Sequence, residues 1–184
     1  NGLKVEAEGP IVNGVLQATK VKFKDSFRYE GMVTDNTTEL EITVPAPTGG
    51  TLTVLIEPSI TDVDGSVNYT NPVKVRARIA SGSTLVATRV DSGGNNDRQI
   101  FEAPVVDFNQ AADSVELLDD GTQSSVGLIE VNTATIDPSP PSDFEIDSAP
   151  VTKATFYANL DVNDRVKARY RSGAWDQIEI EVED

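Results

Sequence analysis

The sequence predicts an all-β protein. Short segments in which apolar and polar residues alternate run through the whole chain, and glycine, asparagine, aspartate and proline separate them. No stretch keeps an apolar period of 3.6 residues over three turns, so we expect no long helix. Three hairpin-like segments can also be laid over one another, which indicates a repeated unit.

The expected strands follow one another along the chain. Because 38% of residues are hydrophobic but only 6% are aromatic, we expect cores built mainly from Val, Ile, Leu and Ala. The strands are Leu3–Glu8, Val15–Lys24, Phe27–Val33, Glu39–Val44, Thr51–Glu57, Val73–Ile79, Thr84–Val90, Gln99–Val106, Ser114–Leu118, Ser125–Val131, Ala154–Ala158, Arg165–Tyr170 and Ala174–Glu183.

The three similar hairpins define the repeat. They are "LKVEAEGPIVNGVLQATKVKFKD" from Leu3, "VKVRARIASGSTLVATRV" from Val73 and "VKARYRSGAWDQIEIEVED" from Val166. They turn at Gly14, Gly82 and Gly173, return through Leu16, Leu85 and Trp175, and then point Val21, Val90 and Ile180 inward. We therefore predict one partial unit (1–26) and two full units (27–91 and 92–184), the last with a Pro-rich loop at 137–143.

Composition excludes several functions. Thirty acidic residues against 15 lysines and arginines give a net charge of -15, which disfavours binding to nucleic acid and to anionic membranes. The chain has no cysteine and no histidine, so Cys/His zinc sites, disulfides and imidazole catalysis are absent. No apolar run reaches the length of a membrane span. A start at Asn1 without a signal peptide suggests a processed product or a fragment.

The hairpins resemble the bacterial domain-of-unknown-function family 5666. Its units close with a "VGxxVxVxGxxxxGxLxAxxV" hairpin, which 2–23, 73–90 and 160–183 fit, and "DFEIDSAPV" at 143–151 is similar to the strand before it. The resemblance implies tandem small OB-like β-barrels in a secreted or envelope-exposed bacterial protein. It implies no catalytic residues. The first unit contains only its closing hairpin, so its barrel would be incomplete.

Two strands place cations on one face. Lys74, Arg76 and Arg78 alternate with apolar residues, and Lys167, Arg169 and Arg171 repeat the pattern. One interpretation is an OB-type binding face for oligonucleotides or oligosaccharides. The favoured interpretation is a cross-strand ladder with acids such as Glu179, Glu181 and Glu183.

Two Asp-rich turns and one tryptophan are the candidate ligand sites. "TDVDGS" contains Asp62 and Asp64, and "LDDGT" contains Asp119 and Asp120, in a pattern similar to part of a calcium loop. Asp and Gly also form ordinary turns, and this is the favoured interpretation. We therefore expect no cofactor; the alternative is that these turns bind Ca²⁺. Trp175 is a candidate sugar platform; a core position like those of Leu16 and Leu85 is favoured instead.

These observations favour a non-catalytic, extracytoplasmic structural or interaction protein, such as a subunit of a cell-surface or filamentous assembly. The alternative is a carbohydrate- or calcium-binding module. Carboxylates are so abundant that chance pairs are expected, so no pair indicates an enzyme. The expected partner is another copy or another envelope protein, because the first hairpin needs a cover for its apolar face. We expect that cover to come from a neighbouring molecule or an upstream segment rather than from the second unit.

Overall fold

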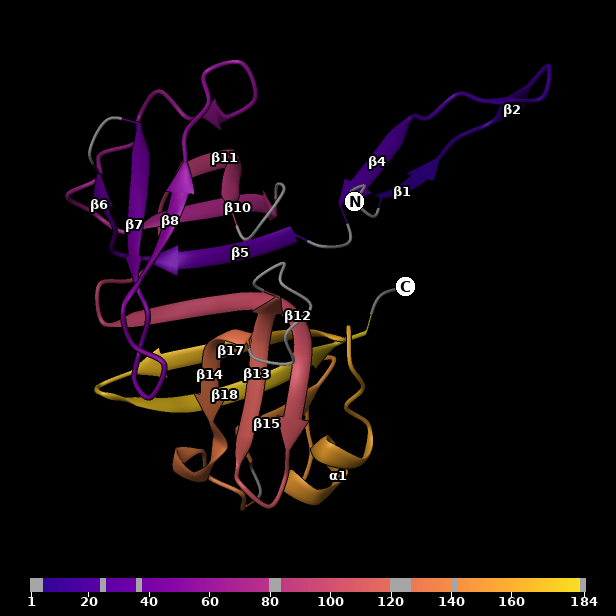
Figure 1. Ribbon diagram of the computed structural model, residues 1–184. Helices are drawn as coiled ribbons and strands as arrows, with labels where there is room; N and C mark the ends of the chain where they lie inside the picture. Colours follow the sequence, from indigo (N-terminus) through magenta and orange to yellow (C-terminus); the bar gives the residue numbers. More distant parts are fainter. Residues whose placement is uncertain are drawn as a thin grey trace.

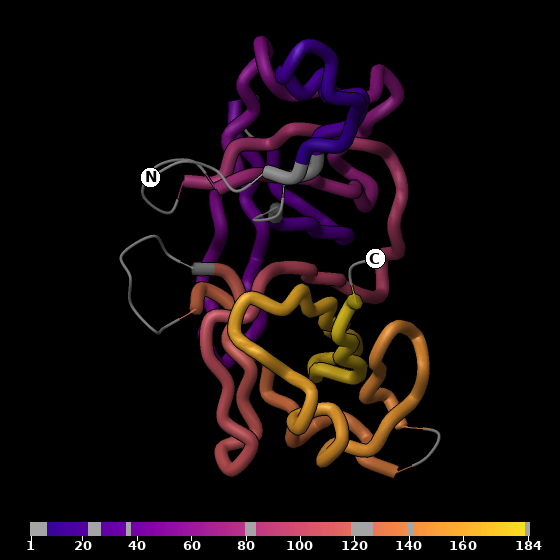
Figure 2. Tube along the Cα trace, turned by 90° about the vertical axis from the view of Figure 1, so that its right-hand side faces the viewer, coloured from indigo at the N-terminus to yellow at the C-terminus, as the bar shows by residue number. Residues whose placement is uncertain are grey.

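The computed structural model describes residues 5–23, 26–35, 38–79, 84–119, 127–139 and 142–182. Strands dominate these residues, which confirms the all-β class. The described chain consists of an N-terminal arm (5–23) and a body with a first half (26–92) and a second half (98–182) (Figures 1 and 2).

The elements follow one another along the chain. The arm contains β1 (Val5–Glu8), β2 (Ile11–Val12), β3 (Val15–Leu16) and β4 (Lys20–Phe23). The first half contains β5 (Ser26–Gly31), β6 (Thr34–Asp35), β7 (Glu39–Thr43), β8 (Thr51–Leu55), β9 (Asp62–Val63), β10 (Val73–Ile79) and β11 (Leu85–Ser92). The second half contains β12 (Arg98–Asn109), β13 (Ser114–Asp119), β14 (Gly127–Asn132), a 3₁₀ turn (Thr133–Thr135), β15 (Phe144–Ile146), β16 (Ala149–Pro150), α1 (Lys153–Ala158), β17 (Arg165–Arg171) and β18 (Ala174–Glu181).

One sheet runs through both halves of the body. Its main path is β16-β15-β18-β17-β12-β5-β10-β11-β8-β7-β6, with β13, β14 and β9 paired beside it. The antiparallel pair β5–β12 joins the halves. Within the described residues, this path ends at β16 and β6 and closes neither half into a barrel.

The register at the junction relates the two halves. Tyr29 of β5 lies opposite Phe101 of β12, and a glutamate follows each ring in the chain. Each glutamate lies opposite the lysine of its own half's closing hairpin: Glu30 opposite Lys74, and Glu102 opposite Lys167. The first strand and closing hairpin of each half are therefore related by an approximate two-fold axis through the Tyr29–Phe101 pair.

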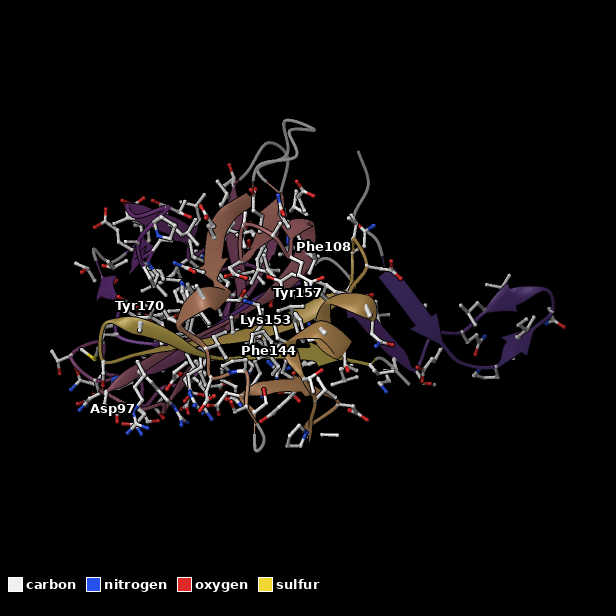
Figure 3. All side chains as sticks on the ribbon, turned by 90° about the horizontal axis from the view of Figure 1, so that it is seen from below. Asp97, Phe108, Phe144, Lys153, Tyr157 and Tyr170 are labelled. Carbon is white, nitrogen blue, oxygen red and sulfur yellow. The ribbon has the colours of Figure 1, made fainter. Side chains whose placement is uncertain are left out.

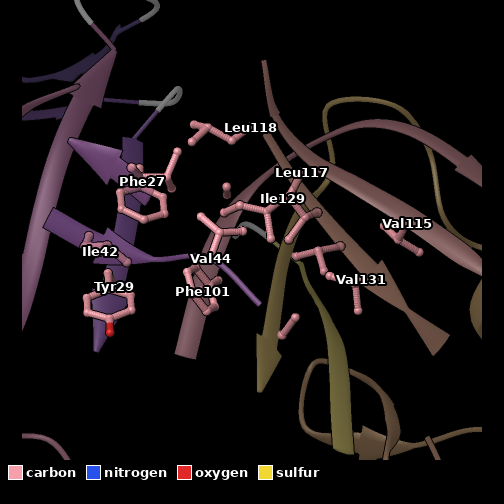
Figure 4. Close-up of a cluster of buried hydrophobic side chains, with 14 of the residues drawn as sticks. Phe27, Tyr29, Ile42, Val44, Phe101, Val115, Leu117, Leu118, Ile129 and Val131 are labelled. Atoms are coloured by element: carbon pink, nitrogen blue, oxygen red, sulfur yellow. The ribbon is translucent and has the colours of Figure 1, made fainter. Parts of the chain in front are cut away.

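Aromatic rings link the cores of the halves. The ring centroid of Phe101 lies 5.2 Å from that of Tyr29 and 5.8 Å from that of Trp175. Figure 4 shows Tyr29 and Phe101 in one cluster with apolar side chains of β7, β13 and β14. Burial raises the pKa of Tyr29 to about 12, although a hydrogen bond from Gln99 opposes the shift. The core is thus continuous from one half to the other.

The structure departs from the predicted elements at one place in particular. The segment 154–158, expected as a strand, lies in the six-residue helix α1. The Thr152 side chain caps this helix by accepting a hydrogen bond from the Thr155 amide, and Phe156 and Tyr157 are buried beneath it. Local capping and burial of two adjacent aromatic residues outweigh the short alternating pattern that indicated a strand.

Candidate functional site

The arm is a long β-ribbon with apolar side chains in the open. β1 pairs with β4, β2 pairs with β3, and Asn13–Gly14 turn the chain with positive φ at both residues. Its two small sheets do not join the body's sheet. Figures 1 and 3 show the ribbon projecting away from the body. The exposed large apolar residues of the arm are Ile11, Val12, Val15, Leu16 and Val21.

The same hairpin positions are buried in the body and exposed in the arm. Leu85 and Trp175 are each 1% exposed, whereas Leu16 is 45% exposed. Val90 and Ile180 are 0% and 5% exposed, whereas Val21 is 53% exposed. The predicted inward direction is therefore confirmed for the two hairpins of the body. The arm has the side chains of a core-facing hairpin, but no described part of the chain covers them.

The arm also differs from the body in charge. The first 26 residues contain four lysines and three acids, which gives +1. The other 158 residues contain eleven lysines and arginines and 27 acids, which gives -16. The arm itself, residues 5–23, contains two lysines and two glutamates, so a nearly neutral apolar ribbon is attached to a strongly negative body.

Ten of the eleven cations of the body lie on one face of the sheet. The register places them there from β5, β10, β11, β12 and β17. They are Arg28, Lys74, Arg76, Arg78, Arg89, Arg98, Arg165, Lys167, Arg169 and Arg171. Figure 3 shows nitrogen-tipped side chains gathered on the side of the body where Asp97 is labelled.

Acids neutralise most of this face. Lys167 donates to Glu179 at 2.8 Å, and Arg165 pairs with both Glu102 and Glu181. Burial raises the pKa of Glu181, and the nearby Glu102 carboxylate adds to the increase. Burial alone would also raise the pKa of Glu179. Hydrogen bonds from Lys167 and Ser148 outweigh that effect and lower it.

The ladder predicted for the last hairpin is present only in part. Lys167 lies opposite Glu179 as expected, but Arg169 pairs with Asp176 and Arg171 with Asp97. A β-bulge between Arg169 and Tyr170 shifts the register, so the alternation of the hairpin could not identify Asp176, and Asp97 comes from the segment before β12, on the other side of β17. The expected partner Glu183 lies outside the described residues.

The cations of β10 have different neighbours. Lys74 lies 3.9 Å from Glu30, but Arg76 lies in register between Arg28 and Arg89. Within the described part of the chain, Arg76 and Arg78 form no ion pair. Cross-strand neutralisation therefore accounts for Lys74 but not for these two arginines.

The two described acids of the turns for which calcium binding was the alternative have other partners. Asp62 lies opposite Arg89 in β9, and the carboxylate of Asp64 accepts hydrogen bonds from the backbone and hydroxyl of Ser66. These bonds lower the pKa of Asp64 and are those of an ordinary Asx turn. The side chain of Asp119 and the whole of Asp120 lie outside the described residues. Among the residues described, no three acids form a metal-binding group.

A calcium titration distinguishes specific binding from general charge screening. At fixed ionic strength, millimolar Ca²⁺ should raise the melting temperature of Asp62→Asn/Asp64→Asn as much as that of the native chain, because Arg89 already neutralises this turn. Differential scanning calorimetry with and without chelator measures the shift. A clearly larger shift in the native chain would instead identify a calcium site at these residues.

Trp175 occupies the core position that was the favoured interpretation. It is buried against Phe101 on one side and Tyr170 on the other, with ring centroids 5.8 Å and 5.3 Å away. An indole enclosed in this way has no open face on which a sugar ring could stack. Its Nε1 donor has no partner among the described residues.

No helix in the described chain has the length and apolarity needed to cross a membrane. No known protein family, curated protein or solved structure matches this chain.

Proposed function

We propose that this protein is a non-catalytic structural subunit that binds a second copy of itself through the arm. The observation on which this depends is the exposure of Leu16 and Val21 at positions that are buried in both hairpins of the body. Fully burying one Val, Leu or Ile side chain stabilises a protein by about 1.5–3 kcal/mol. Covering the five exposed apolar residues of the arm would therefore supply a substantial association energy.

The nearly neutral arm is compatible with a second copy as the partner. Two bodies that each have a charge of -16 repel one another, whereas the arm, with two lysines and two glutamates, can approach the body of another copy without that repulsion. The outer edges of β1 and β4 have no strand beside them in the described chain, so they can also add to a sheet edge of the partner. A contact of arm to body is head-to-tail, and its repetition without closure gives a filament.

The equivalent registers of Glu30–Lys74 and Glu102–Lys167 support a tandem repeat. We assign the two halves to related OB-like units whose sheets remain open in the described residues, and the arm to the closing hairpin of a third. The resemblance of the three hairpins to family 5666 supports an extracytoplasmic location in a bacterium. Nucleic acid is not proposed as a partner, because the body is strongly acidic.

The test is a pair of charge-matched arm variants. Leu16→Asp/Val21→Asp should abolish self-association, because both substitutions place a carboxylate in the apolar contact. The control Asn13→Asp/Gln17→Asp adds the same charge to exposed polar positions of the same ribbon. Multi-angle light scattering over a concentration series measures the mass.

We expect the native chain and the control to form larger species as concentration rises and the apolar variant to remain a monomer. A native chain that stays monomeric at every concentration would refute self-association. An apolar variant that associates as strongly as the control would refute the role of the arm.

A further inference from the structure

One loop of the first half, between β9 and β10, and the linker that follows β11 line an open hollow of about 360 Å³. This volume lies in the lower part of the range for small-molecule sites. The hollow is independent of the arm. No motif of the sequence indicated it, because the segment "SGGNND" at 92–97 has the composition of an ordinary linker. Its lining residues are Ser66, Asn68, Asn71, Pro72, Ser92, Gly93, Gly94, Asn95 and Asn96.

The lining is neutral and polar. None of the nine lining residues is charged, although 24% of the chain is charged. Four are asparagines and two are serines. Cation sites are usually built from carboxylates and anion sites from lysine or arginine, so the uncharged lining favours a neutral ligand.

Three amides of the hollow are available to a ligand. The side chains of Asn71, Asn95 and Asn96 make no hydrogen bond within the described chain. Each amide group has two donors and an acceptor. Sugar hydroxyls likewise donate and accept, so neighbouring hydroxyls on a ring can be paired with these amides in both directions.

The walls around these amides are fixed by other contacts. The Ser66 hydroxyl lies 3.3 Å from that of Ser92 and joins the loop to the end of β11, and the Asn68 side chain accepts hydrogen bonds from the backbone and hydroxyl of Thr70. The Gly93 amide donates to the Pro72 carbonyl at 3.2 Å. A side chain at Gly94, where φ is +120°, would come within 3.0 Å of Glu30 and Pro72. Glycine is therefore required for the loop to approach this closely.

We propose that this hollow binds one or two rings of a neutral saccharide. The exposed amides of Asn71, Asn95 and Asn96 hydrogen-bond the hydroxyls of the sugar. The linker that joins the two halves thereby becomes one wall of a binding site. In an assembly of many copies, each copy would present one such site.

The test is a titration of the whole 184-residue chain, followed by NMR of its amides. The probes are glucose, galactose, mannose, N-acetylglucosamine and their common disaccharides, with galacturonate and sulfate as charged comparisons. We expect saturable shifts at the asparagines of the hollow with at least one neutral sugar. Asn71→Ala/Asn95→Ala should weaken binding about ten-fold or more, and Gln17→Ala, an exposed amide of the arm, should leave it unchanged.

Two controls make the result decisive. The double variant should keep the native melting temperature, because these two side chains make no hydrogen bond within the described chain. A second variant, Gly94→Val, should displace the linker wall of the hollow, because its side chain does not fit against Glu30 and Pro72, and should abolish the shifts. The proposal is overturned if no neutral sugar produces saturable shifts, if only the charged probes bind, or if binding survives the double substitution.

Discussion

Replacing Phe101 with alanine should lower the free energy of unfolding by about 3–5 kcal/mol, the usual cost of removing a buried phenylalanine. This ring is fully buried and packs between Tyr29 of the first half and Trp175 of the second. Its removal leaves a cavity at the junction of the two cores, where neither half can collapse without disturbing the β5–β12 pair. Urea denaturation followed by the fluorescence of Trp175, the single tryptophan of the chain, measures the change.

Phe108→Ala is the matched control. Phe108 is on the same strand, but it is only partly buried and contacts Tyr157 at a centroid distance of 6.3 Å. We expect a clearly smaller loss of stability than for Phe101→Ala. Equal losses would contradict the assignment of Phe101 as the link between the cores.

Replacing Arg165 with methionine should also lower the free energy of unfolding, by about 3–5 kcal/mol near neutral pH. Arg165 is buried and pairs with Glu102 and Glu181, which both lose this counter-charge in the variant. The control Arg171→Met breaks a half-exposed pair with Asp97 and should cost no more than about 1 kcal/mol.

The loss in Arg165→Met should shrink on acidification. In the native protein, burial and the nearby Glu102 raise the pKa of Glu181, so ionising this group destabilises the fold as pH rises above its unfolded pKa. Without Arg165 that cost becomes larger. Protonation of Glu181 at low pH removes this destabilisation. The free energy of unfolding lost in Arg165→Met should therefore be larger at pH 7 than at pH 4, as measured by denaturation at both pH values. A deficit independent of pH would show that lost packing, and not the two carboxylates, is responsible.

Much of the fold could be predicted from alternation alone, and the failures have local causes. The β10 hairpin begins and alternates as predicted because each apolar residue from Val73 to Ala77 enters the core. The helix at 153–158 was mistaken for a strand because six residues are too few to show a helical apolar period, and the burial of Phe156 and Tyr157 depends on packing against the rest of the chain. The sequence also could not predict that β5 and β12 pair across the repeat, since strand partners are set by long-range packing.

The candidate sites were less predictable. The apolar residues of the arm can be read from the sequence. Their exposure could not be predicted, because it depends on which other parts of the chain pack against the arm. The ladder of the last hairpin was displaced by the bulge beside Arg169, and Asp62 faces Arg89 because β9 lies beside β11, a pairing with no local sequence signal. The hollow was missed because loop residues far apart in the chain form it.

The central claim is that the arm joins one copy to the next. Sedimentation velocity on the full chain and on a chain lacking residues 1–24 tests it most directly, since the truncation retains β5 and the whole body. We predict concentration-dependent larger species for the full chain, a monomer for the truncated chain, and the same melting temperature for the body in dilute solution. A truncated chain that sediments with the same mass distribution as the full chain would contradict the claim.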